Sequence, residues 1–238
     1  MTLATKMPVI GEIGWIEFIV GTMFAGKTEE LLRNLRRVSH AKIPYIVLKH
    51  SKDTRYGEET IKTHYGEGIS AIPVSKARHI IKVIEKKEKE TGENIQVVAI
   101  DEVQFFDSQH IFILEGKTII LWDIVEITRE LANRGKRVIL AGLDVDFRGL
   151  PFGPVGSLYV EAEYVTKLHA LCSVCGKPAH RAQRIVEGKA ASWNSPTEFL
   201  GGSDSYESRC RKCYKQPSPL DEDEMDENGM PLAKTMEA

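Results

Sequence analysis

Apolar runs and amphipathic stretches alternate along the first two thirds of the chain. Short continuous apolar runs are typical of strands buried on both faces, whereas apolar residues three or four positions apart indicate helices. The pattern predicts strands at residues 14–20, 45–49, 95–100 and 137–141, and helices at 29–38, 77–91 and 124–134. We therefore expect an α/β fold with a parallel sheet flanked by helices.

The segment between the first strand and the first helix fits the phosphate-binding pattern GxxxxGK[ST]. Glycines at its ends let the backbone N–H groups and the helix N-terminus surround phosphate oxygens, while the lysine supplies a positive charge and the threonine a magnesium ligand. A chance Gly-rich turn is the alternative, but the flanking strand and helix favour nucleotide binding. The predicted ATP-binding loop comprises Gly21, Thr22, Met23, Phe24, Ala25, Gly26, Lys27 and Thr28.

Two carboxylates, Asp101 and Glu102, follow the apolar strand 95–100. An Asp at a strand end is the usual partner of a phosphate-binding loop, where it reaches the magnesium shell. A second acid beside it is well placed to accept a proton from an attacking hydroxyl. We predict that Asp101 and Thr28 bind Mg²⁺ and that Glu102 is the general base. The alternative is that the two carboxylates simply cap the end of the strand.

Two polar or Gly-rich segments follow strand ends, where α/β sheets place ligands. Residues 50–70 contain the sequence Asp53-Thr54-Arg55; the residue pattern alone favours an ordinary surface loop, and a substrate or phosphate role is the alternative. Residues 142–154 are too rich in Gly and Pro for regular structure. Their Phe147 and Phe152 are candidates either for covering the core or for walling a planar base.

Four cysteines form two CxxC pairs, Cys172 with Cys175 and Cys210 with Cys213. In a cytosolic chain, two such pairs favour a structural zinc site of four thiolates over disulfides. A redox pair or free thiols are the alternative. The pairs enclose a long loop, 181–208, which a metal clamp would fix as a candidate lid over a substrate.

Charge is divided unevenly along the chain. Residues 217–238 carry seven acidic and one basic residue and are expected to be a disordered tail, whereas residues 1–216 have a net charge of +4. That small surplus suits an anionic small substrate and does not favour nucleic acid. No apolar run is long enough to span a membrane, and the N-terminus lacks a secretory signal, so we expect a cytoplasmic protein.

The chain resembles the type II thymidine kinases, which are tetrameric. The likeness extends from about Gly14 to Tyr214 and rests on motifs that occur in the family's order. These are GTMFAGKT at 21–28, KDTRY at 52–56, DEVQFF at 101–106, ANRGKRVILAGLDVDFRGLPFGP at 132–154, CSVC at 172–175, GGSDSY at 201–206 and CRKC at 210–213.

The resemblance implies transfer of the ATP γ-phosphate to the 5′-hydroxyl of thymidine or deoxyuridine, with Glu102 as catalytic base. It places the ATP beside the phosphate-binding loop, Asp53 to Arg55, Asp101, Glu102, Val103 and Gln104. It also implies that four residues enclose the thymine ring and that a lasso loop between the CxxC pairs holds the base through main-chain groups. These positions are Phe105, Leu143, Phe147 and Phe152, with Thr197, Glu198, Phe199, Leu200, Gly201 and Tyr206 in the lasso.

We expect a P-loop domain at residues 1–167, a zinc-binding and lasso subdomain at 168–214 and the tail at 215–238. A zinc-ribbon ATPase that acts on nucleic acid is the rival function. One segment departs from the family: residues 108–122 intervene before the helix at 124–134 and predict an apolar hairpin, either an ornament or an oligomer contact.

Overall fold

The computed structural model describes residues 13–54, 60–62, 68–197 and 205–218. Its centre is a six-stranded sheet in which every neighbouring pair is parallel. The strand order is β10 (Tyr164–Leu168), β1 (Trp15–Gly21), β9 (Arg137–Leu143), β6 (Val97–Asp101), β2 (Tyr45–His50) and β5 (Ile72–Val74).

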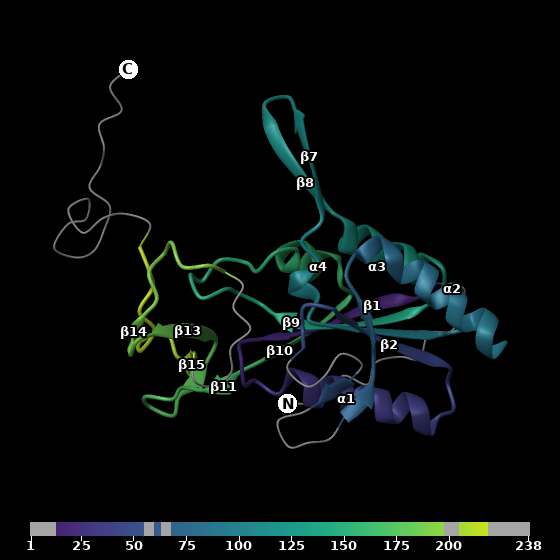
Figure 1. The fold of residues 1–238 in the computed structure, drawn as a ribbon, viewed down its shortest axis with the longest axis horizontal. Helices are drawn as coiled ribbons and strands as arrows, with labels where there is room; N and C mark the ends of the chain where they lie inside the picture. Colours follow the sequence, from purple (N-terminus) through teal and green to yellow (C-terminus); the bar gives the residue numbers. More distant parts are fainter. Residues whose placement is uncertain (1–12, 55–59, 63–67, 198–204, 219–238) are drawn as a thin grey trace.

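Helices cover both faces of this sheet and make three layers (Figure 1). On one face lie α2 (Ile80–Thr91), α3 (Asp123–Asn133) and α4 (Val155–Glu161), with the short 3₁₀ helix η1 (Ala77–His79) leading into α2. On the other face lies α1 (Lys27–His40), next to the small antiparallel pair β3 (Thr60–Lys62) and β4 (Gly68–Ser70).

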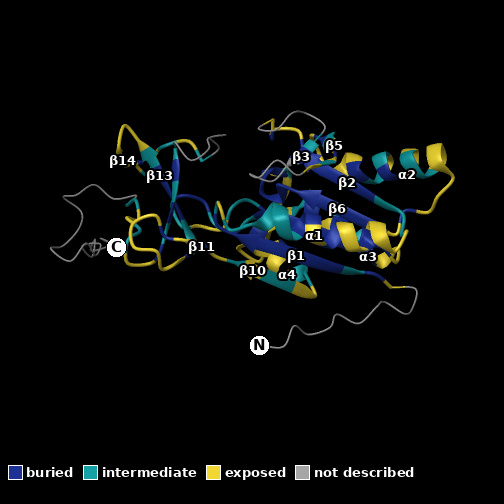
Figure 2. Ribbon diagram, turned by 90° about the horizontal axis from the view of Figure 1, so that it is seen from below, coloured by how far each residue is buried: buried dark blue, intermediate teal, exposed yellow. Residues whose placement is uncertain are grey.

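The two hydrophobic clusters correspond to the two faces of the sheet. Phe18 faces the cluster that α2, α3 and α4 complete, whereas its neighbour Ile19 faces α1 through Leu31 and Leu35. This alternation follows from the opposite directions of successive side chains in a strand. Figure 2 shows the result, with the central strands buried and the outer sides of the helices exposed.

Beyond the central sheet, the chain from residue 170 forms small antiparallel sheets. β11 (Ala170–Leu171) pairs with β12 (Pro178–Ala179), and β13 (Arg181–Val186) pairs with β14 (Lys189–Ala190) and β15 (Tyr206–Arg209). Short strands of this kind have little core of their own, so their stability depends on what they pack against or bind.

A separate hairpin, β7 (Gln109–Leu114) with β8 (Lys117–Trp122), projects from the body (Figure 1). Its turn residues Glu115 and Gly116 both have positive φ, 50° and 74°, as a two-residue type I′ turn requires. The hairpin predicted from the apolar segment is therefore confirmed.

The predicted α/β fold and its parallel sheet are confirmed. Within the central sheet and the helices that cover it, strands β5 and β10 and helix α4 were not predicted, and neither were the short strands outside that sheet, β3, β4 and β11 to β15. The segment 142–154 was expected to lack regular structure, but β9 continues to Leu143 and Val145 bridges Pro151. No helix in the described part of the chain is long and apolar enough to cross a membrane.

Candidate nucleotide and metal sites

The predicted nucleotide residues lie at one edge of the central sheet. All six strands are parallel, so the segments that follow β1, β9, β6 and β2 leave from the same edge. The register places Gly21 opposite Leu143 and Lys49 opposite Asp101. The phosphate-binding loop, the acidic pair and residues 50–54 therefore converge there, although they are far apart in the sequence.

Local geometry explains both glycines of the phosphate-binding loop. A Cβ on Gly21 would lie 2.5 Å from the Leu168 carbonyl oxygen, so only glycine lets β10 approach this closely. Gly26, immediately before α1, adopts the left-handed conformation with φ 79°. Lys27 Nζ donates to the Thr22 carbonyl oxygen at 2.8 Å, whereas Thr22 Oγ1 is buried and is among the side-chain atoms of the described residues without a hydrogen-bond partner.

The acidic pair lies between β6 and the 3₁₀ turn η2 (Val103–Phe105). Asp101 is buried, and its Oδ1 accepts the Glu102 backbone N–H at 2.9 Å. Glu102 is 8% exposed and is left-handed, with φ 55° and ψ 43°. A non-glycine residue in this region costs roughly 1–2 kcal/mol, and such outliers cluster at functional sites.

Gln104 connects Glu102 to the end of β9. Its side-chain amide donates to Glu102 Oε2, and its carbonyl oxygen accepts the Leu143 backbone N–H at 3.1 Å. The fit is close, because a Cβ on Gly142 would meet Gln104 Oε1 at 2.7 Å. Gln104 is buried, so this bridge holds the Glu102 carboxylate in a defined position.

The predicted aromatic residues form two groups. Phe105 contacts Phe152 edge-to-face, with ring centroids 5.8 Å apart. Phe147 packs with Tyr206 in a small buried cluster that also includes Met23 of the phosphate-binding loop. The structure thus brings Phe147 and Tyr206 together across 59 positions of sequence and places both beside the loop.

Residues after β2 form a third part of this edge. Asp53 is buried, and its carbonyl oxygen accepts Lys49 Nζ at 2.8 Å, while Thr54 is exposed. The predicted Arg55, Glu198, Phe199, Leu200 and Gly201, and most of the acidic tail, lie outside the described residues.

Arg148 holds the segment 193–197, a role that the sequence did not suggest. Its guanidinium donates to the carbonyl oxygens of Trp193 and Ser195, at 2.7 and 2.9 Å, and to Thr197 Oγ1 at 2.8 Å. It also stacks over Phe147, 4.8 Å from the ring centroid. From β13, Arg184 donates to the Pro196 carbonyl oxygen. The feature of the sequence that could have indicated this role is the position of Arg148, an arginine in a Gly-rich loop that follows the end of a strand.

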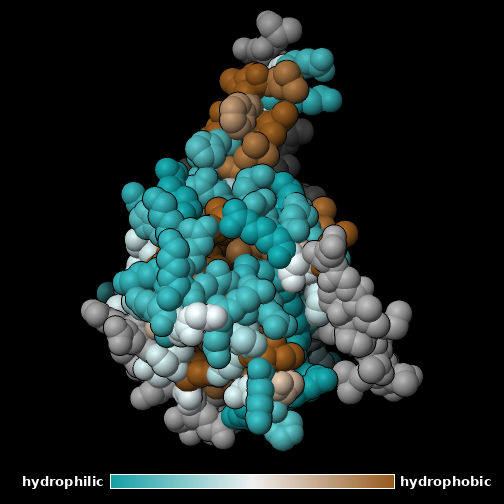
Figure 3. Space-filling view, turned by 90° about the vertical axis from the view of Figure 1, so that its right-hand side faces the viewer, coloured by the Kyte–Doolittle hydropathy of each residue, from teal (hydrophilic) through white to brown (hydrophobic). Residues whose placement is uncertain are grey.

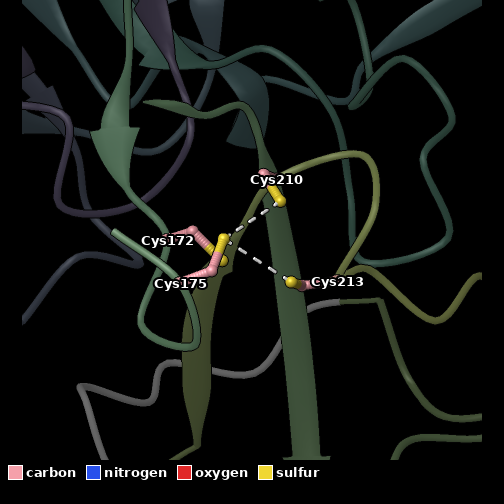
Figure 4. A group of neighbouring side chains, drawn as sticks. All are labelled: Cys172, Cys175, Cys210 and Cys213. Atoms are coloured by element: carbon pink, nitrogen blue, oxygen red, sulfur yellow. Dashed lines mark hydrogen bonds between the residues drawn. The ribbon is translucent and has the colours of Figure 1, made fainter. Parts of the chain in front are cut away.

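The four cysteine side chains point toward one another (Figure 4). Their sulfur atoms all lie within 4.8 Å of one another. Cys175 Sγ is 3.6 Å from Cys210 Sγ and 3.7 Å from Cys213 Sγ, far beyond a disulfide bond. These separations are close to the roughly 3.8 Å between thiolates at tetrahedral corners when Zn–S bonds are about 2.3 Å. The donor set therefore fits a zinc ion.

Crowding among these thiols separates their pKa values. Burial raises the pKa of Cys172, but backbone N–H groups of Cys210 and Val174 outweigh it and lower that pKa to about 6. Side-chain contacts with Cys175 and Cys210 instead raise the pKa of Cys213 to about 12. A cation among the sulfurs removes this conflict, since it stabilises all of the thiolates.

The cysteine region packs directly on the phosphate-binding loop. Ser208 Oγ donates to the Met23 carbonyl oxygen at 2.9 Å, and Ala25 packs against the cluster that contains Cys172 and Cys210. The two predicted sites are thus in contact.

Fold and site together define a P-loop NTPase-like α/β protein with a four-cysteine cluster. Residues 14–214 match the family model described as thymidine kinase. The chain belongs to the thymidine kinase family, and the resemblance inferred from its motifs is confirmed. The family implies a nucleoside kinase that uses ATP and thymidine.

Similar solved structures include a genome packaging NTPase, B204, from Sulfolobus turreted icosahedral virus 2. In complex with ATP-gammaS it is 14% identical, with a TM-score of 0.42 over 66% of this chain and 75% of that one. In complex with sulfate it is 16% identical, with a TM-score of 0.41 over the same shares. This likeness is too low to bear on function.

Proposed function

We propose that the protein transfers the γ-phosphate of ATP to the 5′-hydroxyl of thymidine or deoxyuridine. Thymidine would yield dTMP for nucleotide salvage. The observation that carries the proposal is the convergence, at one sheet edge, of a phosphate-binding loop with a buried, left-handed Glu102. The family match extends over both.

The phosphate-binding loop holds the triphosphate. Backbone N–H groups of residues 21–28 and the N-terminus of α1 bind the phosphate oxygens. Lys27 Nζ, which bonds to the Thr22 carbonyl oxygen, moves to the β and γ phosphates. Residues 53–55 and 101–104 border the same nucleotide.

Thr28 and Asp101 would hold Mg²⁺. A hydroxyl and a carboxylate oxygen are the hard ligands that this ion prefers, and Asp101 lies buried at the end of β6. When bound, magnesium would supply positive charge that offsets the negative charge of the phosphates during transfer. Asp101 Oδ1 already accepts the Glu102 N–H, so the same carboxylate also fixes the backbone of the base.

Glu102 accepts the proton of the 5′-hydroxyl while the 5′-oxygen of the nucleoside attacks the γ-phosphorus and ADP leaves. Phosphoryl transfer demands little covalent work from the protein, so position is decisive. Gln104 supplies that position, because its amide holds the carboxylate and its carbonyl anchors on the Leu143 N–H.

The thymine ring would lie among aromatic and main-chain groups. Phe105, Leu143, Phe147 and Phe152 enclose it. The lasso, from Thr197 to Gly201 with Tyr206, hydrogen-bonds its edge. Support comes from the burial of Phe147 against Tyr206 and from the arginines that hold Pro196 and Thr197, where the lasso begins.

The proposed domain division, zinc site and oligomeric state complete this picture of a salvage enzyme. We propose a P-loop domain at 1–167, a zinc-clamped lasso subdomain at 168–214 and a disordered tail at 215–238. Four thiolates leave no open coordination position, so zinc has a structural role. We further propose that the protein is a cytoplasmic homo-oligomer, a tetramer if it follows the type II thymidine kinases that it resembles. We propose that it acts on neither nucleic acid nor membranes.

The test is ATP consumption by zinc-loaded protein with Mg²⁺ and either thymidine, deoxyuridine or single-stranded DNA. We expect turnover with a nucleoside and none with DNA, with dTMP or dUMP identified by chromatography. ATP consumption only with DNA would replace the proposal by the zinc-ribbon ATPase. A folded sample that phosphorylates no nucleoside would remove it.

A further inference from the structure

The hairpin β7–β8 carries more exposed large apolar side chains than any other element of the described chain. Seven of its side chains are between 37 and 80% exposed. They are Ile111, Phe112, Ile113, Leu114, Ile119, Ile120 and Leu121. Figure 3 shows them as a hydrophobic projection above a largely hydrophilic body. Their combined exposed area is on the order of 500 Å², and patches of this size mark interaction sites.

Both faces of the hairpin are apolar. Ile111 lies opposite Ile120 on one face, and Phe112 lies opposite Ile119 on the other. A hairpin with one solvated face alternates apolar and polar residues, and an isolated pair of strands is marginal in water. This sequence is therefore suited to a hairpin that is covered.

The hairpin has a fixed base. Asp123, the first residue of α3, pairs with Arg78 and with His110, each at 3.0 Å, and its N–H donates to the Ser108 carbonyl oxygen. These bonds tie the base of the hairpin to the start of α3.

A groove of about 350 Å³ lies at this base, between β8, α3 and α4. Its apolar lining includes Leu121, Trp122, Val125 and Val160, and Val160 is 87% exposed. The groove is thus continuous with the apolar surface of the hairpin and has no cover in the described part of the chain.

We propose that a second copy of this chain covers the hairpin, with the two hairpins side by side and antiparallel. In that arrangement the tip of each hairpin, Phe112 to Leu114, enters the groove at the base of the other. A two-fold interface requires a self-complementary surface, and this one carries an apolar tip and an apolar groove about 20 Å apart, the length of a six-residue strand.

Area and charge agree with this occupant. The apolar side chains of the hairpin alone supply on the order of 500 Å², more than half of the roughly 800 Å² per partner of a standard interface. The groove carries Glu126 and Glu161, which both pair with Arg129, and it therefore has one net negative charge that suits Lys117 beside the tip. A membrane surface fits less well, because Lys117 is the single lysine or arginine in 108–122, whereas membrane-binding segments are rich in them. The proposal is independent of the proposed function.

Substitutions at the tip and at the groove test the interface. Ile113→Lys and Val160→Lys place a charge at two highly exposed positions, so both variants are expected to fold. Val186→Lys, at the exposed last residue of β13, is the matched control. By sedimentation velocity over a dilution series, we expect each interface variant to raise the dissociation constant at least tenfold and the control to leave it unchanged. Unchanged self-association in both, or a monomeric wild type, overturns the proposal.

Photo-cross-linking identifies the contact itself, separately from any other oligomer interface. A benzophenone amino acid at position 113, in a mixture of isotopically light and heavy chains, should give cross-links between copies to residues 120–129 or 156–161. Cross-links only to other segments overturn the proposal. A membrane role for the hairpin would give a different result. The protein would sediment with phosphatidylcholine vesicles, Ile113→Lys would abolish this binding, and no cross-links between copies would form.

Discussion

Glu102 combines burial, a left-handed backbone and a hydrogen bond from Gln104. We expect Glu102→Gln to lower kcat by roughly 10²–10⁴-fold, because the amide cannot accept the hydroxyl proton. ATP affinity should stay within about twofold, since the phosphates bind to the loop at residues 21–28. Steady-state kinetics and equilibrium ATP binding measure both quantities, and exposed Glu93→Gln is the control. A variant with wild-type turnover would exclude this residue as the base.

Gln104 is predicted to act through Glu102. Gln104→Leu keeps a similar volume but removes both hydrogen bonds, so the carboxylate loses its fixed position. We expect kcat to fall about tenfold while the KM for ATP is little changed. A merely structural role would instead raise both KM values or lower the unfolding temperature together with kcat. Kinetics and thermal unfolding of the same preparation separate the two cases.

Site residues that belong to short contiguous motifs could be predicted from the sequence. Residues 21–28 carry a complete motif, and Asp101 and Glu102 follow an unmistakable buried strand. The role of Arg148 and the bridging role of Gln104 were not predicted. Two of the partners of Arg148 are carbonyl oxygens 45 and 47 positions away, and main-chain acceptors leave no trace in the residue types of a sequence.

The segment 193–197 depends on the loop after β9. Arg148 makes a forked set of bonds to it that lysine cannot reproduce, because lysine offers a single ammonium group. We expect Arg148→Lys to raise the KM for thymidine about tenfold and to leave the KM for ATP unchanged, since this segment leads into the lasso. Arg211→Lys, on an exposed turn, is the control. Equal changes in both KM values would show that Arg148 does not act through the lasso.

Elements were predictable where burial is continuous. β1, β6 and β9 are almost wholly buried and consist mainly of apolar residues, with Glu17 as the charged exception inside β1. β10 is an edge strand with a mixed burial pattern, and α4 has only seven residues after Pro154, so neither gives a clear period. The family motif made the hairpin conspicuous as an insertion. The structure adds that Phe105 and Phe106, just before it, stay buried.

The cysteine region and the sheet form one working unit. Ser208 donates a hydrogen bond to the Met23 carbonyl oxygen, and Phe147 packs on Tyr206. Folding of the region after residue 170 therefore affects both the phosphate-binding loop and the aromatic residues beside it. The two CxxC pairs predicted a metal clamp from spacing alone. Their contact with the loop was not predictable, because it depends on how β10 directs the chain past Gly21.

This coupling predicts the effect of zinc removal. Zinc binding to four thiolates contributes on the order of 10 kcal/mol to the order of a small domain, and the strands β11–β15 have little core to replace it. We expect Cys175→Ser, or chelation, to abolish one metal equivalent per chain, to raise the KM for thymidine more than tenfold and to weaken ATP binding less, because α1 and β1 keep their own core. Metal analysis, kinetics and limited proteolysis of residues 170–214 measure these effects. Val174→Ala, an exposed position within the same CxxC turn, should retain metal and activity. A metal-free protein with an unchanged KM and unchanged protease resistance would show that the cluster is dispensable for the site.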